Sequence, residues 1–181
     1  MSGKILSCFF DSQTYRMKNH KQNHIYSHAQ LTGLVVLRVL IGWYFLYEGL
    51  TKFLSHNWTA YGYLKDSQGL LGEFFKWLAD MPQVMTVINY LNIYGLILVG
   101  LSLLLGVFSR IGSIGAVTML VLYYLSHPPT LDAVYVLRPE GSYLWIDKNL
   151  IIMAAVIVTG LLFPNSHRIG IDRYIYKKRK A

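Results

Sequence analysis

The sequence contains a single cysteine and few charged residues, and these shortages exclude several classes of protein. Cys8 has no second cysteine in the chain, so neither an intramolecular disulfide nor a Cys-x-x-Cys redox pair can form. Zinc and iron–sulfur spacings, a phosphate-binding loop and a dinucleotide fingerprint are also missing. A bis-histidine haem requires two histidines within the membrane, and only His127 is close to such a position. We therefore expect no haem, metal or flavin cofactor.

Charged residues make up 14% of the 181 positions, whereas a typical soluble domain has about 25%. The few charges leave three uncharged runs, at residues 81–109, 111–131 and 149–167. A helix needs about 20 mostly apolar residues to cross a bilayer, so each run is long enough for one span. A fourth apolar segment, residues 32–54, is interrupted by only three charged side chains, those of Arg38, Glu48 and Lys52.

These runs predict an all-α integral membrane protein built as a bundle of four transmembrane helices. The membrane domain is expected at residues 32–166, between a basic arm at residues 1–31 and a basic tail at residues 167–181. The expected spans are residues 32–54, 84–108, 111–126 and 149–163. The expected outer loops are residues 55–83 and 127–148.

Lysine and arginine are distributed unevenly along the chain, and their distribution predicts the orientation of the spans. Most of them lie in residues 1–31, at Arg110 and in residues 167–181, whereas the two longer loops hold most of the acidic residues. Positively charged flanking segments remain on the cytoplasmic side of a membrane. We therefore expect a multi-pass protein of the inner (cytoplasmic) membrane with both termini in the cytoplasm. The net charge of +8 reflects this topology, and nucleic-acid binding is not expected.

The first outer loop contains apolar residues at helical spacing, with charged residues between them. This pattern predicts a short amphipathic helix lying in the outer interface of the membrane, where it either seals the bundle or acts as a lid. The apolar set is Leu70, Leu71, Phe74, Phe75, Leu78 and Met81, and the charged set is Glu73, Lys76 and Asp80.

Three charged residues within the first span are candidates for function, because an ionised group in a membrane is costly unless it is paired or hydrated. Glu48 and Lys52 are four residues apart, in the order that favours a helical ion pair. Arg38 lies about 15 Å from Glu48 along the helix axis, so it belongs to the inner leaflet. The alternative interpretation is structural pairing, with Lys52 extending its ammonium group to the interface.

Polar residues also gather at the outer ends of the other three spans. The expected topology brings them to one depth with Glu48 and Lys52, which predicts a pocket for a small polar or anionic ligand. The alternative is the ordinary polarity of helix ends. The residues are Asn89, Asn92, Tyr123, Tyr124, Ser126, His127, Asp147, Lys148 and Asn149.

Four segments together resemble the DoxX/DoxD family and, within it, the large subunit of thiosulfate:quinone oxidoreductases. They are LRVLIGWYFLYEGLTKFL, NIYGLILVGLSLLLGVFSRIG, YYLSHPP and YLWIDKNLI, and the resemblance extends over residues 34–173. The resemblance implies a four-helix membrane fold and the oxidation of thiosulfate to tetrathionate, with electrons delivered to a membrane quinone. It also implies that Arg38, Lys52, Arg110 and Lys148 occupy the basic positions of the family.

The leading hypothesis is a quinone-linked oxidoreductase subunit that oxidises a small sulfur anion such as thiosulfate. Its expected partners are membrane lipid, a diffusible quinone, and either a second subunit or further copies of the chain. Two alternatives remain open, a non-enzymatic anchor subunit of a larger complex and a protein that handles small solutes or lipids. The expected substrate-binding residues are Lys52, Lys148, Asn92 and Arg38, the expected proton-transferring residues are Glu48 and His127, and the expected quinone-binding residues are Tyr123 and Tyr124.

Overall fold

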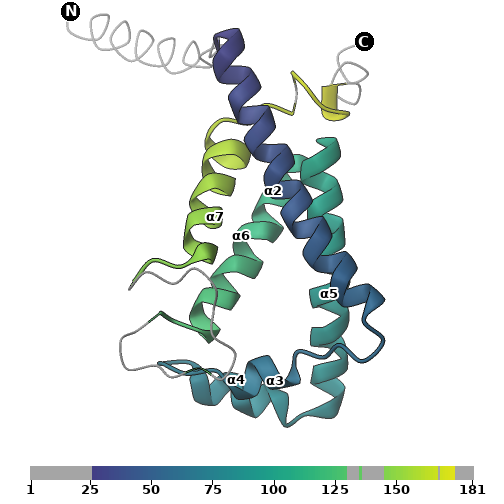
Figure 1. Cartoon of the computed structure of the whole chain (residues 1–181), viewed down its shortest axis with the longest axis vertical. Helices are drawn as coiled ribbons and strands as arrows, with labels where there is room; N and C mark the ends of the chain where they lie inside the picture. The colour runs from purple at the N-terminus through teal and green to yellow at the C-terminus, as the bar shows by residue number, and fades with distance from the viewer. Residues whose placement is uncertain (1–25, 130–134, 136–144, 167, 174–181) are drawn as a thin grey trace, which may run out of the picture. The chain divides into compact units, whose positions relative to one another are not determined.

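The structure is a computed structural model that describes residues 26–129, 135, 145–166 and 168–173. The chain divides into two compact units, residues 1–31 and 32–181, and all of the expected site residues belong to the second. Most of the expected N-terminal arm, much of the second outer loop and the end of the tail lie outside the described residues. The helices are α2 (His28–Leu54), α3 (Tyr61–Lys65), α4 (Gly72–Ala79), α5 (Pro82–Leu105), α6 (Ser109–Ser126) and α7 (Lys148–Val156), and α7 continues as the π-helix η1 (Ile157–Leu162) (Figure 1).

The helical fold class is confirmed for the described residues. Two helices, α2 and α5, are long and apolar enough to cross a membrane, whereas the continuous helix Lys148–Leu162 is shorter. The first helix begins at His28 rather than near residue 32. Ser27 and Gln30 explain the earlier start, because the backbone N–H of each donates a hydrogen bond to the side chain of the other, which is the reciprocal arrangement of a capping box.

Helices α2 and α5 pack backbone to backbone at glycine positions. A Cβ atom at Gly42 would lie 2.7 Å from the backbone nitrogen of Leu104, and one at Gly100 would lie 2.5 Å from that of Leu46. Small residues allow this close approach between membrane helices. The glycine positions of α2 and α5 are therefore filled by the neighbouring helix and do not line an open cavity there.

Helices α5 and α6 form the tight hairpin that the sequence predicts. Helix α5 ends at Gly106 in the left-handed conformation, with φ of 66°, which glycine adopts without steric cost. Asp172 then stabilises the start of α6, because its carboxylate accepts hydrogen bonds from the backbone N–H groups of Phe108 (2.8 Å) and Ser109 (3.3 Å). Residues 168–173, expected at the beginning of the tail, thus pack back onto the bundle.

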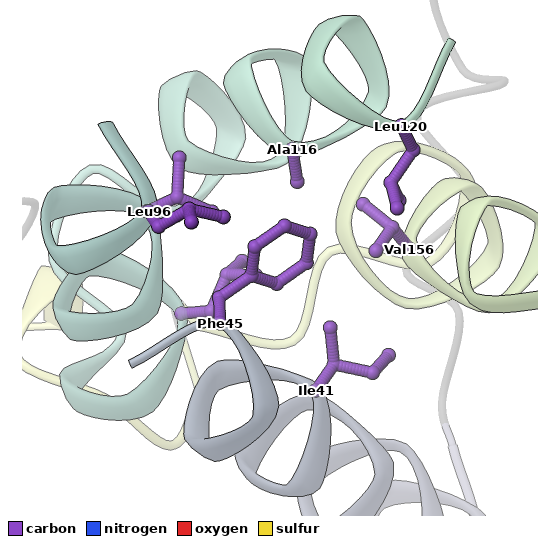
Figure 2. Packing of buried hydrophobic residues seen from close by; sticks show 8 residues of the cluster. Ile41, Phe45, Leu96, Ala116, Leu120 and Val156 are labelled. Carbon is purple, nitrogen blue, oxygen red and sulfur yellow. The ribbon is translucent and has the colours of Figure 1, made fainter. Parts of the chain in front are cut away.

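The main apolar core surrounds Phe45, whose side chain is completely buried. Figure 2 shows its ring pointing into the space between the helices, where it meets side chains from α5, α6 and α7. One core is therefore shared by all four of the longer helical segments. Its members are Ile41, Phe45, Leu96, Val99, Leu103, Ala116, Leu120 and Val156.

Helices α3 and α4 pack on each other and run across the ends of α5 and α6 (Figure 1). A second core of Ala60, Leu64, Phe75, Ala79 and Met85 holds them. The expected amphipathic helix is present as α4, and its apolar residues face in two directions. Phe75 faces the second core, whereas the apolar residues Leu70, Leu71, Phe74 and Trp77 are exposed, because neighbouring residues on a helix point about 100° apart.

Candidate functional site

Helices α2, α5 and α6 meet at the amide oxygen of Asn92. The Lys52 ammonium group donates a hydrogen bond to this oxygen at 3.1 Å, and the Tyr123 hydroxyl donates to it at 3.0 Å. Glu48 lies one turn before Lys52, with its carboxylate 3.9 Å from the ammonium group. The expected i, i+4 pair is therefore present, and Asn92 connects it to the two neighbouring helices.

Aromatic rings surround the two lysines of this region. The Lys52 nitrogen lies 5.0 Å from the ring centre of Trp58 and 5.7 Å from that of Tyr123. The Lys148 nitrogen lies 5.4 Å from the ring centre of Tyr44. Ammonium groups over aromatic faces are stabilised by the ring quadrupole. These rings hold both cations toward the protein interior.

Lys148 is positioned by the start of α7. Asp147 is almost fully buried and caps this helix, because its carboxylate accepts hydrogen bonds from the Leu150 backbone N–H (2.8 Å) and the Asn149 side chain (2.9 Å). The Asp147 carboxylate therefore has its hydrogen bonds within the first turn of α7. Lys148 lies near enough to Lys52 for the two positive charges to repel each other.

The Lys52 site, which we define as Lys52, Asn92, Tyr123, Glu48 and Lys148, thus carries two ammonium groups against one adjacent carboxylate. The Glu48 side chain is about one-third exposed and that of Lys52 about one-fifth. A partly buried surplus of positive charge can hold a small anion through charge-assisted hydrogen bonds. These five residues were all predicted to contribute to an outer site.

His127 lies close to this site but has different partners. Its ring is 3% exposed and stacks on Tyr63, with ring centres 3.9 Å apart, while Tyr135 covers it at 4.7 Å. Burial lowers the pKa of His127 below its ordinary value, and the nearby Asp66 carboxylate partly opposes this. The Tyr63 hydroxyl donates a hydrogen bond to the Tyr123 backbone carbonyl, so a single tyrosine connects His127 with the Lys52 site.

The two expected quinone-binding tyrosines point to different partners. Tyr123 faces Asn92, whereas the Tyr124 hydroxyl donates a hydrogen bond of 3.1 Å to the backbone carbonyl of Trp145. Adjacent residues on a helix diverge by about 100°, which explains the separation. Only Tyr123 belongs to the Lys52 site.

Arg38 lies apart from the other expected substrate-binding residues. Fourteen residues of helix place it about 21 Å from Lys52 along the axis. Its guanidinium group is buried and donates hydrogen bonds to the Asn165 side chain (2.5 Å) and to the backbone carbonyl of Ile169 (2.9 Å). Arg38 therefore connects α2 to the segment after η1, close to the Asp172 charge.

Sequence reasoning did not identify Tyr44, Trp58, Tyr63 or Asp66 as contacts of the candidate site residues. Tyr44 precedes Glu48 by one helical turn, which is a usable signal. The other three lie on the first outer loop, and no periodicity relates a loop residue to a distant helix end. Among the residues that the structure describes, no group of three His, Cys, Asp or Glu side chains forms a metal site.

An open polar cleft of about 350 Å³ lies beside this region, at the connection between α3 and α4. Residues 65–69 form one part of its lining, and Gly72, Glu73 and Lys76 form the remainder. Two of the charged residues that line the cleft, Lys76 and Glu73, form an ion pair on α4, with the ammonium 3.1 Å from the carboxylate. The cleft is therefore polar without a clear excess of either charge.

The long apolar helices, with a few buried charges between them, define a helical integral membrane protein. The model of the DoxX family matches residues 33–128, which is just over half of the chain, and the protein belongs to this family. The matched region runs from α2 to the end of α6 and includes Glu48, Lys52, Asn92 and His127 but not Lys148. No curated protein and no solved structure gives a match.

Proposed function

We propose that this DoxX-family protein crosses the inner membrane four times, through α2, α5, α6 and the helix Lys148–Leu162. All four segments contribute to the core around Phe45, which supports a common depth for them. The excess of Lys and Arg in the terminal segments favours cytoplasmic termini. With that orientation, the Lys52 site opens on the outer side.

The Lys52 site would bind a small sulfur anion such as thiosulfate. The observation that carries this proposal is the pair of lysines, Lys52 and Lys148, with the Glu48 carboxylate 3.9 Å from the Lys52 ammonium group. Asp147 does not neutralise them fully, because its carboxylate caps α7. Asn92 and Tyr123 would orient the anion, since an amide and a hydroxyl can each donate a hydrogen bond.

The proposed reaction is the oxidation of the anion by a membrane quinone. Two thiosulfate ions lose one electron each and join through a new sulfur–sulfur bond to give tetrathionate. The quinone accepts both electrons and two protons and becomes the quinol. Because Cys8 is the sole cysteine, no disulfide within the chain can carry the electrons, which favours direct transfer from the anion to the quinone.

Aromatic residues would contact the quinone, and a carboxylate would exchange protons with it. Tyr123 lies beside Lys52, and its hydroxyl already points toward the Lys52 site, so it would contact the quinone head group. Tyr124 and the exposed Trp145 would border the approach from the lipid. Glu48 is the carboxylate nearest to Lys52 and would exchange one of the two protons.

The test is thiosulfate-dependent reduction of a soluble quinone analogue by the purified protein in lipid nanodiscs. Wild-type protein should reduce decyl-ubiquinone or menadione only when thiosulfate is present. Lys52→Met and Lys148→Met should each lower kcat/KM for thiosulfate by about tenfold or more, as expected for the loss of one charge-assisted hydrogen bond. Lys76→Met, at an exposed lysine that pairs with Glu73, is the matched control and should leave kcat/KM unchanged.

The absence of thiosulfate-dependent reduction, with native membrane extract supplied as a source of partner subunits, would reject this reaction.

A different observation then favours the second candidate, a non-enzymatic anchor subunit. Helix α4 and the residues before it expose four large apolar side chains, those of Leu70, Leu71, Phe74 and Trp77. Affinity purification with mass spectrometry should then recover a stoichiometric partner, and Lys148→Met should not disturb the assembly.

A further inference from the structure

His127 has one ring nitrogen that lacks a hydrogen-bond partner among the described residues. This atom, Nε2, is buried, and the nearest carboxylate oxygen is that of Asp66 at 3.9 Å. Unpaired buried polar atoms are uncommon, because each costs the free energy of its lost hydration. The small displacement that would close this gap makes Asp66 the natural partner of Nε2.

The other ring nitrogen of His127 begins a short chain of buried hydroxyl groups. Nδ1 lies 3.1 Å from the Ser126 hydroxyl, which bonds to the Ser67 hydroxyl, which in turn reaches the Tyr63 carbonyl at 3.4 Å. Hydroxyl groups donate and accept, so this chain fits both neutral tautomers of the imidazole. With the proton on Nδ1, each group donates toward Tyr63. With the proton on Nε2, Ser126 donates to Nδ1 instead.

The chain ends at a carbonyl group, which cannot pass a proton on. Exchange of the His127 proton with water must therefore proceed from the Nε2 side, where Asp66 lies. Asp66 also lines the open cleft of about 350 Å³ between α3 and α4, a volume that holds about ten water molecules. Its side chain is about one-seventh exposed, whereas that of His127 is almost completely buried.

We propose that Asp66 carries protons between this cleft and Nε2 of His127. In the forward step, the protonated Asp66 carboxyl transfers its proton to Nε2, which leaves a carboxylate beside an imidazolium. In the reverse step, the imidazolium returns the proton, and the carboxyl group releases it to water in the cleft. No electrons move in either step, and the total charge of the pair is unchanged by the transfer.

The use of this proton in catalysis rests on the proposed function. Reduction of a quinone consumes two protons, and His127 is separated from the Lys52 site by the ring of Tyr63, which stacks on the imidazole and contacts Tyr123 edge to face. The Asp66–His127 pair would therefore hold a proton beside the Lys52 site, on the far side of the Tyr63 ring. The existence of the pair itself does not depend on thiosulfate or quinone.

The groups around His127 limit what else can exchange its proton. Tyr63 and Tyr135 both pack against the ring, and burial raises the pKa of both phenols, so they remain neutral at physiological pH. The negative charge of Asp147, at the start of α7, also raises the pKa of Tyr63. The Asp147 carboxylate itself accepts the hydrogen bonds of its helix cap. Asp66 is thus the carboxylate that acts on His127.

The experiment is nitrogen-15 and carbon-13 NMR of histidine-labelled full-length protein in nanodiscs, without thiosulfate or quinone. The His127 signals are assigned with His127→Asn, and their titration and the exchange of the imidazole proton with water are measured. Asp66→Asn should lower the pKa of His127 by about one unit and slow proton exchange by about tenfold or more. Glu73→Gln, a carboxylate that lines the same cleft, is the control and should change neither quantity.

Unchanged exchange in Asp66→Asn would overturn the proposal, as would equal slowing by Glu73→Gln. If Asp66→Asn does not fold, the wild-type protein supplies a second test. The carboxyl carbon signal of Asp66 should then show an inflection at the pH where His127 titrates, and its absence overturns the proposal. Because these measurements need no substrate, they stand even if the thiosulfate reaction itself fails.

Discussion

The Lys52 ammonium group lies 3.1 Å from the side-chain oxygen of Asn92, and this contact joins the C-terminal part of α2 to the middle of α5. The same oxygen accepts a hydrogen bond from Tyr123 on α6. A partly buried acceptor that serves two donors fixes both of them, because either donor would lose its partner if the amide moved. The geometry of the Lys52 site therefore depends on Asn92.

Replacing Asn92 by leucine should destabilise the protein. The substitution removes the shared acceptor and leaves the Lys52 ammonium and the Tyr123 hydroxyl without this partner. We expect the free energy of unfolding to fall by about 1–3 kcal/mol, the usual cost of leaving buried polar groups unpaired. Reversible unfolding in mixed micelles measures this change. Thr118→Leu, at an exposed position on α6, is the control, and an equal loss in both variants would contradict the assignment.

Gly100→Ala should disrupt the packing of α5 against α2. The new Cβ would lie 2.5 Å from the backbone nitrogen of Leu46, and a backbone atom cannot rotate away as a flexible side chain can. We expect a loss of about 1–3 kcal/mol from overpacking. Gly33→Ala on α2 meets no atom within 4 Å and should be neutral or slightly stabilising, because alanine favours helices. The same unfolding assay compares the two variants.

Arg38→Lys should separate stability from ligand binding. Lysine lacks the planar fork that reaches both Asn165 and Ile169, so we expect a lower unfolding temperature. The KM for thiosulfate should not change, because Arg38 lies about 21 Å from Lys52 along α2. An increase in KM with unchanged stability would show that Arg38 takes part in substrate binding after all.

The stability of the protein should decrease as the pH falls through the histidine range. Burial lowers the pKa of His127 below its ordinary value of 6.5, so the unfolded chain binds its proton more readily than the native protein does. The free energy of unfolding is therefore highest above pH 6.5 and falls below it, by at most about 1.4 kcal/mol per pH unit. His127→Asn should flatten this dependence. His56→Asn, at an exposed histidine, should leave it intact.

Local sequence patterns predicted the helices and part of the candidate site. The i, i+4 spacing of Glu48 and Lys52 gave their ion pair, and uncharged runs gave α5 and α6 to within a few residues of their observed ends. Helical periodicity relates residues on one face of one helix, so these features were accessible from the sequence. The sequence placed Asn92 in the candidate site only through the expected depth of the helix ends, and its role as a shared acceptor came from the structure.

Contacts between segments far apart in the chain could not be predicted in this way. The bond between Arg38 and Asn165 spans 127 positions, and the cap that Asp172 provides for Ser109 spans 63. Neither pairing leaves a periodic signal. The burial of Phe75 could not be predicted for a related reason, because it was decided by the neighbouring helix α3 and the start of α5, not by the pattern of α4 alone.

The most direct test of the central claim is equilibrium binding of radiolabelled thiosulfate to the protein in nanodiscs. Wild-type protein should bind it saturably, and a Lys52→Met/Lys148→Met double variant should bind it at least about a hundredfold more weakly, as expected when two charged hydrogen-bond donors are lost. A Lys65→Met/Lys76→Met variant, altered at two lysines that line the cleft, should bind as the wild type does. Equal affinity in the wild type and the Lys52→Met/Lys148→Met variant would contradict an anion site built from these two lysines.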